Sequence, residues 1–251
     1  MKKSLHELLD QYAGILGQMK REEFSVRDDR YSGVFLPVAF DDYWSGDFKV
    51  MHVGRETAGW NTKTRRNTLE RIFAANQGGN ARHIVDEAVK RYRDHLPLDQ
   101  GGKLKTTSRS RFKQYYFRMA KELGITPTSL VYGNLFAWDY DGKSPLTRPQ
   151  TELDAVAATS LKLLATQIKF FSPDAIVFST GRAGIDGYIK QLFSEHFDGH
   201  KTIRTEPGKM WEFQVGKVTC FRIAHPRALR GHQQYRSNVI QRLKEIRAGR
   251  S

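Results

Sequence analysis

The second half of the chain alternates short apolar runs with a long helical pattern, and this alternation limits the possible folds more than any other feature. Residues 129–136 and 174–180 are bounded apolar runs typical of buried strands, and a helical pattern spans 150–171 between them. A last helix is expected over about 235–247. Alternating strands and helices predict an α/β fold: a three-layer α/β/α sandwich with a central, mostly parallel sheet.

The first half of the chain adds elements of both kinds. Apolar residues at helical spacing predict a helix over about 4–22, a mostly helical stretch over 64–96 and a helix over about 111–123. The short apolar run at 48–53 ends at a glycine and predicts a buried strand that runs into a loop. The polar stretch 99–110 is expected to be a surface loop.

No internal repeat and no linker stands out, so we expect a single domain over 1–251. Within it, residues 1–47 form an N-terminal helix and extension, and 62–123 form a helical, basic insertion. Residues 211–215 and 217–223 are expected to pair as a hairpin near the end of the domain.

Charge is the most informative part of the composition. The chain has 41 Lys and Arg against 27 Asp and Glu, which gives a formal net charge of +14. Basic chains bind polyanions by releasing condensed counterions, so nucleic acid is the leading expected partner. Membrane surfaces are also anionic, but no helical stretch combines a broad aromatic face with a lysine-rich one. We therefore expect no membrane association.

The remaining composition excludes several classes of protein. Cys220 is the only cysteine, which rules out an internal disulfide framework and an iron–sulfur cluster held by several thiolates. No apolar run approaches the roughly 20 residues that span a bilayer. The N-terminus lacks an apolar segment of signal-peptide length, so a cytoplasmic protein is expected.

Candidate site residues follow the predicted strands, because ligands of α/β sheets bind beyond the carboxyl ends of strands. Four strand ends are followed by loops rich in glycine and polar residues: 53–61, 131–139, 178–184 and 223–230. Glu56, Asn134 and His225 come from three of these loops. A carboxylate, an amide and an imidazole suit acid–base or electrostatic chemistry on a polar heterocycle.

Cofactor and metal motifs are missing from these loops. The glycine spacing of a dinucleotide site and the Lys-Ser/Thr ending of a phosphate-binding P-loop are absent. No His, Cys or carboxylate cluster has ligand spacing. We therefore expect no cofactor and no metal.

Taken together, the loops resemble the uracil-DNA glycosylase superfamily over roughly residues 48–236. The Gly-Arg-Glu-Thr sequence at 54–57 is similar to the family's first motif, Gly-x-Asp/Asn-Pro or Gly-Glu-x-Pro-Gly. Asn134 matches the base-reading Asn at the end of a middle strand. The His-Pro pair at 225–226 matches the closing His-Pro-Ser-Pro-type loop, and Leu229 falls at its wedge position.

The resemblance implies a DNA glycosylase that cuts the bond between a flipped-out base and its sugar. Glu56 would hold the attacking water and stabilise the sugar cation. His225 would donate a hydrogen bond to the anionic base, best as a neutral imidazole. Asn134 offers a donor and an acceptor and would read the edge of a pyrimidine. Each residue also has a structural interpretation: Glu56 as a carboxylate that braces its loop, His225 as a side chain that supports its loop, and Asn134 as a turn residue.

Further residues are assigned by their place around these motifs. Trp60 and Phe136 are candidates for stacking on the base, although core packing is the commoner fate of aromatic side chains. Leu229 would fill the vacated base stack. The basic residues near the loops are expected to contact DNA phosphates: Lys63, Arg65, Arg66, Lys103, Lys105, Arg109, Arg111, Arg182, Arg227 and Arg230.

The expected substrate is uracil or a 5-substituted pyrimidine. Ala58 stands where the strictest uracil-specific members have a bulky Tyr, which leaves more room at the pyrimidine C5 position. A hypermodified phage base is therefore within the expected range. No lysine stands out as a Schiff-base nucleophile, so we expect a monomeric, monofunctional enzyme that leaves an abasic site. The sequence leaves open single- or double-stranded DNA, and repair or phage defence.

Two other function classes stay open. One is a catalytically silent nucleic-acid-binding module on the same fold, which is favoured by Thr57 in place of the motif's Pro and by Arg227 and Ala228 in place of Ser and Pro. The other is a small-molecule nucleotide or nucleoside hydrolase with an incidental basic surface.

Overall fold

A computed structural model describes residues 4–24, 29–60, 69–100, 103–181, 184–228 and 230–250. The chain divides into two compact units, each built from three stretches. Unit 1 comprises Met1–Val38, Glu56–His95 and Gly133–Phe171. Unit 2 comprises Ala39–Arg55, Leu96–Tyr132 and Ser172–Ser251. The expectation of one domain over 1–251 stays a prediction, and its internal boundaries at 47, 62 and 123 do not coincide with those of the units.

A six-stranded sheet has the order β2-β1-β3-β6-β5-β4. Its strands are β1 (Val50–Gly54), β2 (Leu130–Asn134), β3 (Ala175–Phe178), β4 (Lys201–Glu206), β5 (Met210–Val215) and β6 (Val218–Ile223). The pairings β1–β3 and β3–β6 are parallel, while β5 pairs antiparallel with both β6 and β4. Because β1, β3 and β6 are parallel neighbours, their carboxyl ends lie along one edge of the sheet.

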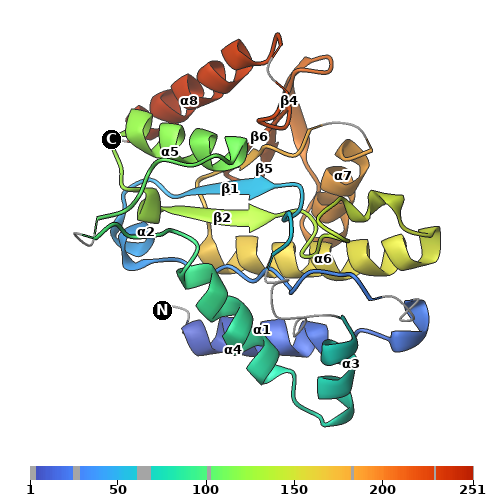
Figure 1. The fold of residues 1–251 in the computed structure, drawn as a ribbon. Helices are drawn as coiled ribbons and strands as arrows, with labels where there is room; N and C mark the ends of the chain where they lie inside the picture. The colour runs from blue at the N-terminus through green and yellow to red at the C-terminus, as the bar shows by residue number, and fades with distance from the viewer. Residues whose placement is uncertain are drawn as a thin grey trace. The chain divides into compact units, whose positions relative to one another are not determined.

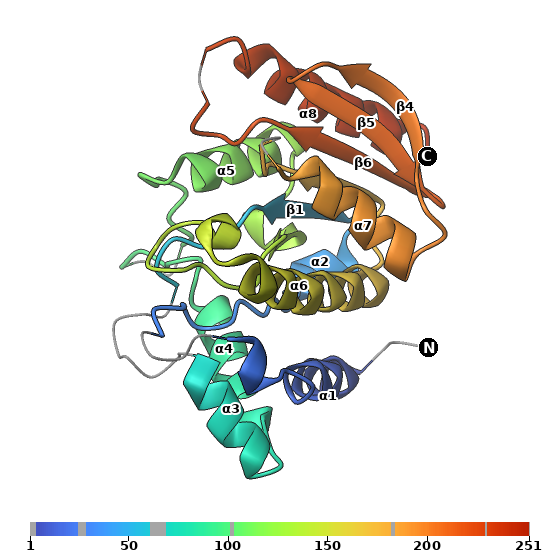
Figure 2. The same ribbon diagram turned by 90° about the vertical axis from the view of Figure 1, so that its right-hand side faces the viewer.

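Helices of unit 2 cover both faces of this sheet (Figures 1 and 2). On one face, α5 (Arg111–Leu123) and α8 (Gln233–Ala248) share a hydrophobic core with side chains of β1, β3, β5 and β6. On the other face, Phe193 of α7 (Asp186–His196) packs against Phe178 and Phe213. The predicted α/β/α class is therefore confirmed, with two antiparallel strands added at one side.

Local signals explain the ends of α5. The Ser110 side chain accepts the Lys113 N–H at the N-cap, and Gly124 ends the helix with a φ of 67°. Only glycine adopts this left-handed conformation without a steric cost. Unit 2 also contains the short helix α2 (Asp41–Ser45) and a 3₁₀ turn at Pro127–Ser129.

Unit 1 is mainly helical. It contains α1 (Leu5–Leu16), α3 (Leu69–Gln77), α4 (Arg82–Arg93) and α6 (Gln150–Phe171), with 3₁₀ turns at Arg21–Glu23 and Pro145–Thr147. A capping box between Ser4 and Glu7 begins α1, and this helix packs against α4 and α6. The hydroxyl of Tyr12, which has no exposed surface, donates to the Pro37 carbonyl at 2.8 Å and fixes the extended segment to the helix.

The structure corrects several predicted bounds. The helix predicted over 4–22 ends at Leu16, because the chain turns at Gly17 and continues into a separate 3₁₀ turn. The sequence analysis missed β4, which is exposed along most of its length and therefore carries no apolar run. Among the described residues, no helix is long and apolar enough to cross a membrane.

Candidate active site

Loops that follow three strands begin side by side at the carboxyl edge of the unit 2 sheet. The Ser179 N–H donates to the Val53 carbonyl at 2.8 Å, and the Gly181 N–H donates to the Ile223 carbonyl at 3.2 Å. Gly181 has a φ of 75°, and a Cβ at this position would lie 3.6 Å from the backbone nitrogen of His225. The loops after β1, β3 and β6 are therefore joined by backbone contacts at the position where the sequence predicts a site.

His225 is held as a neutral imidazole. Its Nδ1 accepts the Arg227 backbone N–H at 3.2 Å, so the proton of the neutral ring is on Nε2. Burial, followed by the charges of Arg55, Arg227 and Arg236, lowers the pKa of His225 to about 4. At neutral pH the side chain therefore offers one hydrogen-bond donor and no positive charge.

A buried arginine fixes the backbone of the His225 loop. Arg236 of α8 has only 3% of its surface exposed, and its Nη2 donates to the carbonyl oxygens of His225, at 3.0 Å, and of Ala228. Its Nη1 donates to the Gln233 side chain at 2.8 Å. These partners are neutral, so they do not neutralise the charge of the guanidinium that positions the loop.

A second buried histidine, His52 of β1, lies beside the loop that follows β3 and was not predicted as a site residue. The Nε2 of His52 is 2.7 Å from the Ser179 Oγ, and its ring stacks on Phe112 with centroids 4.1 Å apart. Burial, with a smaller contribution from the charge of His225, lowers the pKa of His52 to about 3. A lone His inside an apolar run carries no sequence signal that separates this role from ordinary core packing.

In unit 1, Asp139 braces the loop that carries Glu56. Its carboxylate has no exposed surface and accepts the Thr57 hydroxyl and the backbone N–H groups of Gly59, Trp60 and Gly142, the last three at 3.0, 3.3 and 2.9 Å. Thr57 therefore replaces the motif's Pro with a side-chain anchor. This role of Asp139 was not predicted from the sequence, because its partners Thr57, Gly59 and Trp60 lie about 80 positions away.

Asn134 is the last residue of β2 and has an unpaired amide. Only 4% of its surface is exposed, and neither Oδ1 nor Nδ2 has a hydrogen-bond partner among the described residues. A buried polar group without a partner costs roughly 1–3 kcal/mol, so most are satisfied in folded proteins. An amide left in this state is able to hydrogen-bond a ligand that presents both an acceptor and a donor.

The other predicted base-binding residues of unit 1 differ in exposure. Phe136 has no exposed surface and in this structure offers no face to a base. Trp60 is half-buried, packs edge-on against Phe35 at 4.8 Å and carries the Arg91 guanidinium 4.6 Å from its ring centroid. Ala58 is exposed, and its position beside a substrate stays a prediction. Stacking by Trp60 stays a prediction.

Some of the residues predicted to contact DNA lie within the described part of the chain and others lie outside it. Exposed basic side chains of unit 2 include six of the predicted phosphate contacts: Lys103, Lys105, Arg109, Arg111, Arg227 and Arg230. Five predicted positions lie outside the described residues: Lys63, Arg65, Arg66, Arg182 and Leu229. Glu56, which is half-buried, belongs with Asn134 to unit 1, and His225 belongs to unit 2. Convergence of these three side chains stays a prediction.

The fold and its strand-end loops define an α/β/α protein with a neutral imidazole at the carboxyl edge of parallel strands. No protein-family model matches the chain, and no curated protein gives a significant match. Within the described ranges, no three His, Cys, Asp or Glu side chains are grouped so that they could hold a metal ion.

Proposed function

We propose that the chain is a monofunctional DNA glycosylase that hydrolyses the N-glycosidic bond of a flipped-out uracil or 5-substituted pyrimidine. The observation that carries this proposal is the state of His225. Its ring is neutral, its proton is on Nε2, and its loop is fixed at the carboxyl edge of the sheet. A fixed neutral donor suits a leaving group that gains negative charge.

The proposed reaction separates charge between the sugar and the base. The bond from C1′ to the base nitrogen breaks, and its electron pair leaves with the base. The Nε2–H of His225 donates a hydrogen bond to the developing anion. A water molecule held by Glu56 then adds to C1′ and gives up one proton to solvent through the carboxylate. The base anion takes up one proton from solvent, so the products are an abasic site and the neutral free base.

Two side chains of unit 1 complete the proposed set. Glu56 would orient the water and stabilise the sugar cation through its carboxylate. Its loop is braced by Asp139, which supports a fixed position for the carboxylate. Asn134 would pair with the acceptor and donor on the edge of the pyrimidine, and its unpaired amide supports this role.

The proposed partner is DNA, bound by a monomer in the cytoplasm. Support comes from the net charge of +14 and from the exposed basic side chains of unit 2. Phosphate contacts of this kind give an affinity that falls as salt rises.

Release of free base from synthetic DNA tests the proposal. Single- and double-stranded oligonucleotides carrying uracil, a thymine mismatch or a bulky 5-modified cytosine are incubated with the wild type and with Glu56→Gln. We expect release of at least one of these bases, an alkali-labile abasic site, and a loss of roughly two to three powers of ten in rate for Glu56→Gln.

A matched control is Glu22→Gln, which removes the same charge from an exposed position of unit 1 outside the predicted site. This variant should keep the wild-type rate. DNA binding without base release by the wild type would instead favour the silent binding module. Cleavage of free nucleosides, together with DNA binding that depends little on salt, would favour the small-molecule hydrolase.

A further inference from the structure

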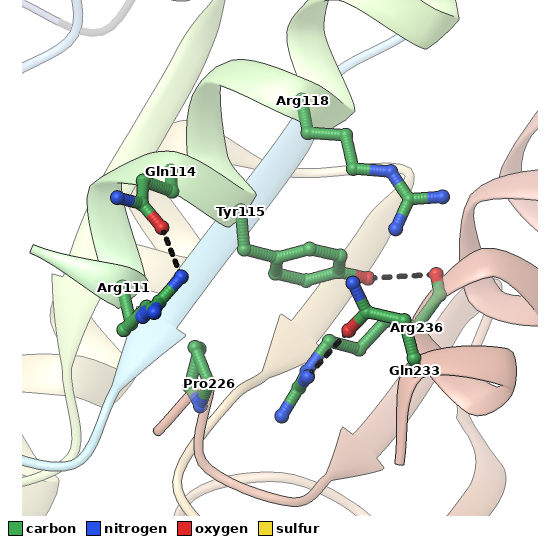
Figure 3. Close-up of a pocket in the computed structure, with 7 residues that line it drawn as sticks. All are labelled: Arg111, Gln114, Tyr115, Arg118, Pro226, Gln233 and Arg236. Atoms are coloured by element: carbon green, nitrogen blue, oxygen red, sulfur yellow. Dashed lines mark hydrogen bonds between the residues drawn. The ribbon is translucent and has the colours of Figure 1, made fainter. Parts of the chain in front are cut away.

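A basic pocket lies beside the His225 loop, entirely within unit 2. It has a volume of about 220 Å³. Figure 3 shows the seven side chains that line it. One face of α5 supplies Arg111, Gln114, Tyr115 and Arg118, and the other wall is formed by Pro226, Gln233 and Arg236. Three guanidinium groups thus line a small cavity whose lining includes no carboxylate.

The charges of this pocket are only partly neutralised. Arg118 pairs with Glu122 at 2.6 Å, but within the described part of the chain no carboxylate pairs with Arg111 or Arg236. The Nε of Arg236 is buried and has no hydrogen-bond partner in the part of the chain that the structure describes. A buried charge without a counterion is costly, so an anion in this pocket would be stabilised by electrostatics.

Helix α8 adds to the attraction for an anion. Gln233 and Arg236 belong to its first turn, and no side chain caps this 16-residue helix. The N–H groups of a first turn lack partners within the helix, and the helix dipole favours negative charge at this end. The hydroxyl of Tyr115 donates to the Arg236 carbonyl at 3.1 Å, which ties α5 to α8 across the pocket (Figure 3).

We infer that this pocket binds one phosphodiester group of the DNA strand whose base is cut, next to the His225 loop. This inference deepens the proposed function and rests on its choice of DNA as partner. Planar guanidinium groups suit phosphate oxygens because two N–H groups can bind them together. Because Arg236 also holds the carbonyls of His225 and Ala228, a phosphate here would be joined to the loop through one side chain.

An adjoining groove favours an internal phosphate over a terminal one. This groove, of about 670 Å³, shares Gln114 and Arg118 with the pocket and is also lined by Thr106, Thr107 and Ser108. A strand held by its phosphate in the pocket therefore has room to continue along α5, past three consecutive hydroxyl side chains that suit further backbone contacts. The rest of the groove lining includes the apolar side chains of Phe117, Ile125 and Pro127.

Arg111→Gln tests the inference, since this side chain is exposed and its loss leaves the loop contacts of Arg236 in place. The affinity for a labelled single strand without terminal phosphates is measured over a series of salt concentrations. We expect weaker binding and a salt slope reduced by about 0.7, which corresponds to one lost phosphate contact on a single strand. Lys217→Gln is the matched control, because it removes one exposed charge at the opposite end of β6 and lines neither cavity.

An Arg111→Gln slope equal to that of Lys217→Gln, or no DNA binding by the wild type, would overturn the inference. Competition by inorganic phosphate as strong as that by an unlabelled strand would also overturn it, because the pocket would then bind free phosphate. A marked preference for a 5′-phosphorylated strand would overturn it as well, because the pocket would then bind a terminal phosphate. Base release is scored separately. If the wild type releases no base but Arg111→Gln still reduces the salt slope, the glycosylase is rejected and the phosphate site is kept. If base is released but the slope does not change, only the phosphate site is rejected.

Discussion

At the scale of single residues, two neutral histidines define the chemistry available at the sheet edge. His52 has no exposed surface and is bound to Ser179, so it serves as part of the scaffold. His225 is less buried, and its ring proton is on Nε2 because Nδ1 accepts the Arg227 backbone N–H. Burial is the main cause of the lowered pKa in both, which separates them from surface histidines that charge near pH 6.5.

These pKa values predict that acid destabilises the protein. Both folded-state values, about 3 and about 4, lie below the ordinary value of 6.5, so the unfolded chain binds more protons as pH falls from 6.5. The stability contributed by the neutral rings is therefore full above pH 6.5. It is lost progressively as the pH falls toward about 4 for His225 and about 3 for His52. At about pH 4.5 each histidine should cost about 2 kcal/mol of unfolding free energy.

Urea unfolding at about pH 7 and pH 4.5 measures this loss. His52→Gln should show a smaller difference between the two pH values than the wild type, whatever its stability at pH 7. Equal differences in the two proteins would contradict a buried, neutral His52.

At the scale of elements, local signals fixed some features of the sequence prediction and long-range contacts decided the rest. The bounds of α5 and α6 agree with the predicted ranges because caps and apolar spacing are local. The strand β4 depends on tertiary context, which leaves little trace in the sequence. The end of α1 at Gly17 is local, and the predicted range passed over this glycine.

In the candidate site too, features with a local sequence signal were predicted and features that depend on long-range contacts were not. His225 was predicted because its motif is local and follows a recognisable strand. The bracing role of Asp139 and the pairing of His52 with Ser179 were missed because each joins segments about 80 or more positions apart. The unpaired state of Asn134 depends on what surrounds it, which no local pattern records.

The loop after β3 offers a test of coupling between elements. Gly181→Ala introduces a side chain at a φ of 75°, and the added Cβ would contact His225. Gly124→Ala carries a similar conformational penalty at a φ of 67°, where nothing lies within 4 Å. Both should lose roughly 1–2 kcal/mol of stability.

Only Gly181→Ala should also slow base release, by about tenfold or more, because relaxation of its turn moves the His225 loop. Thermal unfolding and base-release rates, measured on the same preparations below the melting temperature, separate the two effects. Equal rates in the two variants would show that the turn at Gly181 does not position His225.

At the scale of the whole molecule, the proposal assigns one reaction to side chains from both compact units. Unit 2 supplies the imidazole, the arginine that fixes its loop, and the basic pocket. Unit 1 supplies the braced carboxylate loop and the unpaired amide. The net charge of +14 favours the proposed binding of a polyanion but does not by itself select a reaction.

A double-mutant cycle on single-turnover base release tests the central claim most directly. The wild type, Glu56→Gln, His225→Ala and the double variant are compared on the best substrate found. If carboxylate and imidazole act on one bound nucleotide, each single change should cost roughly two to three powers of ten, and the double variant should lose less than the product of the two. Absence of release by the wild type, or losses that multiply as if the two residues were independent, would contradict the account.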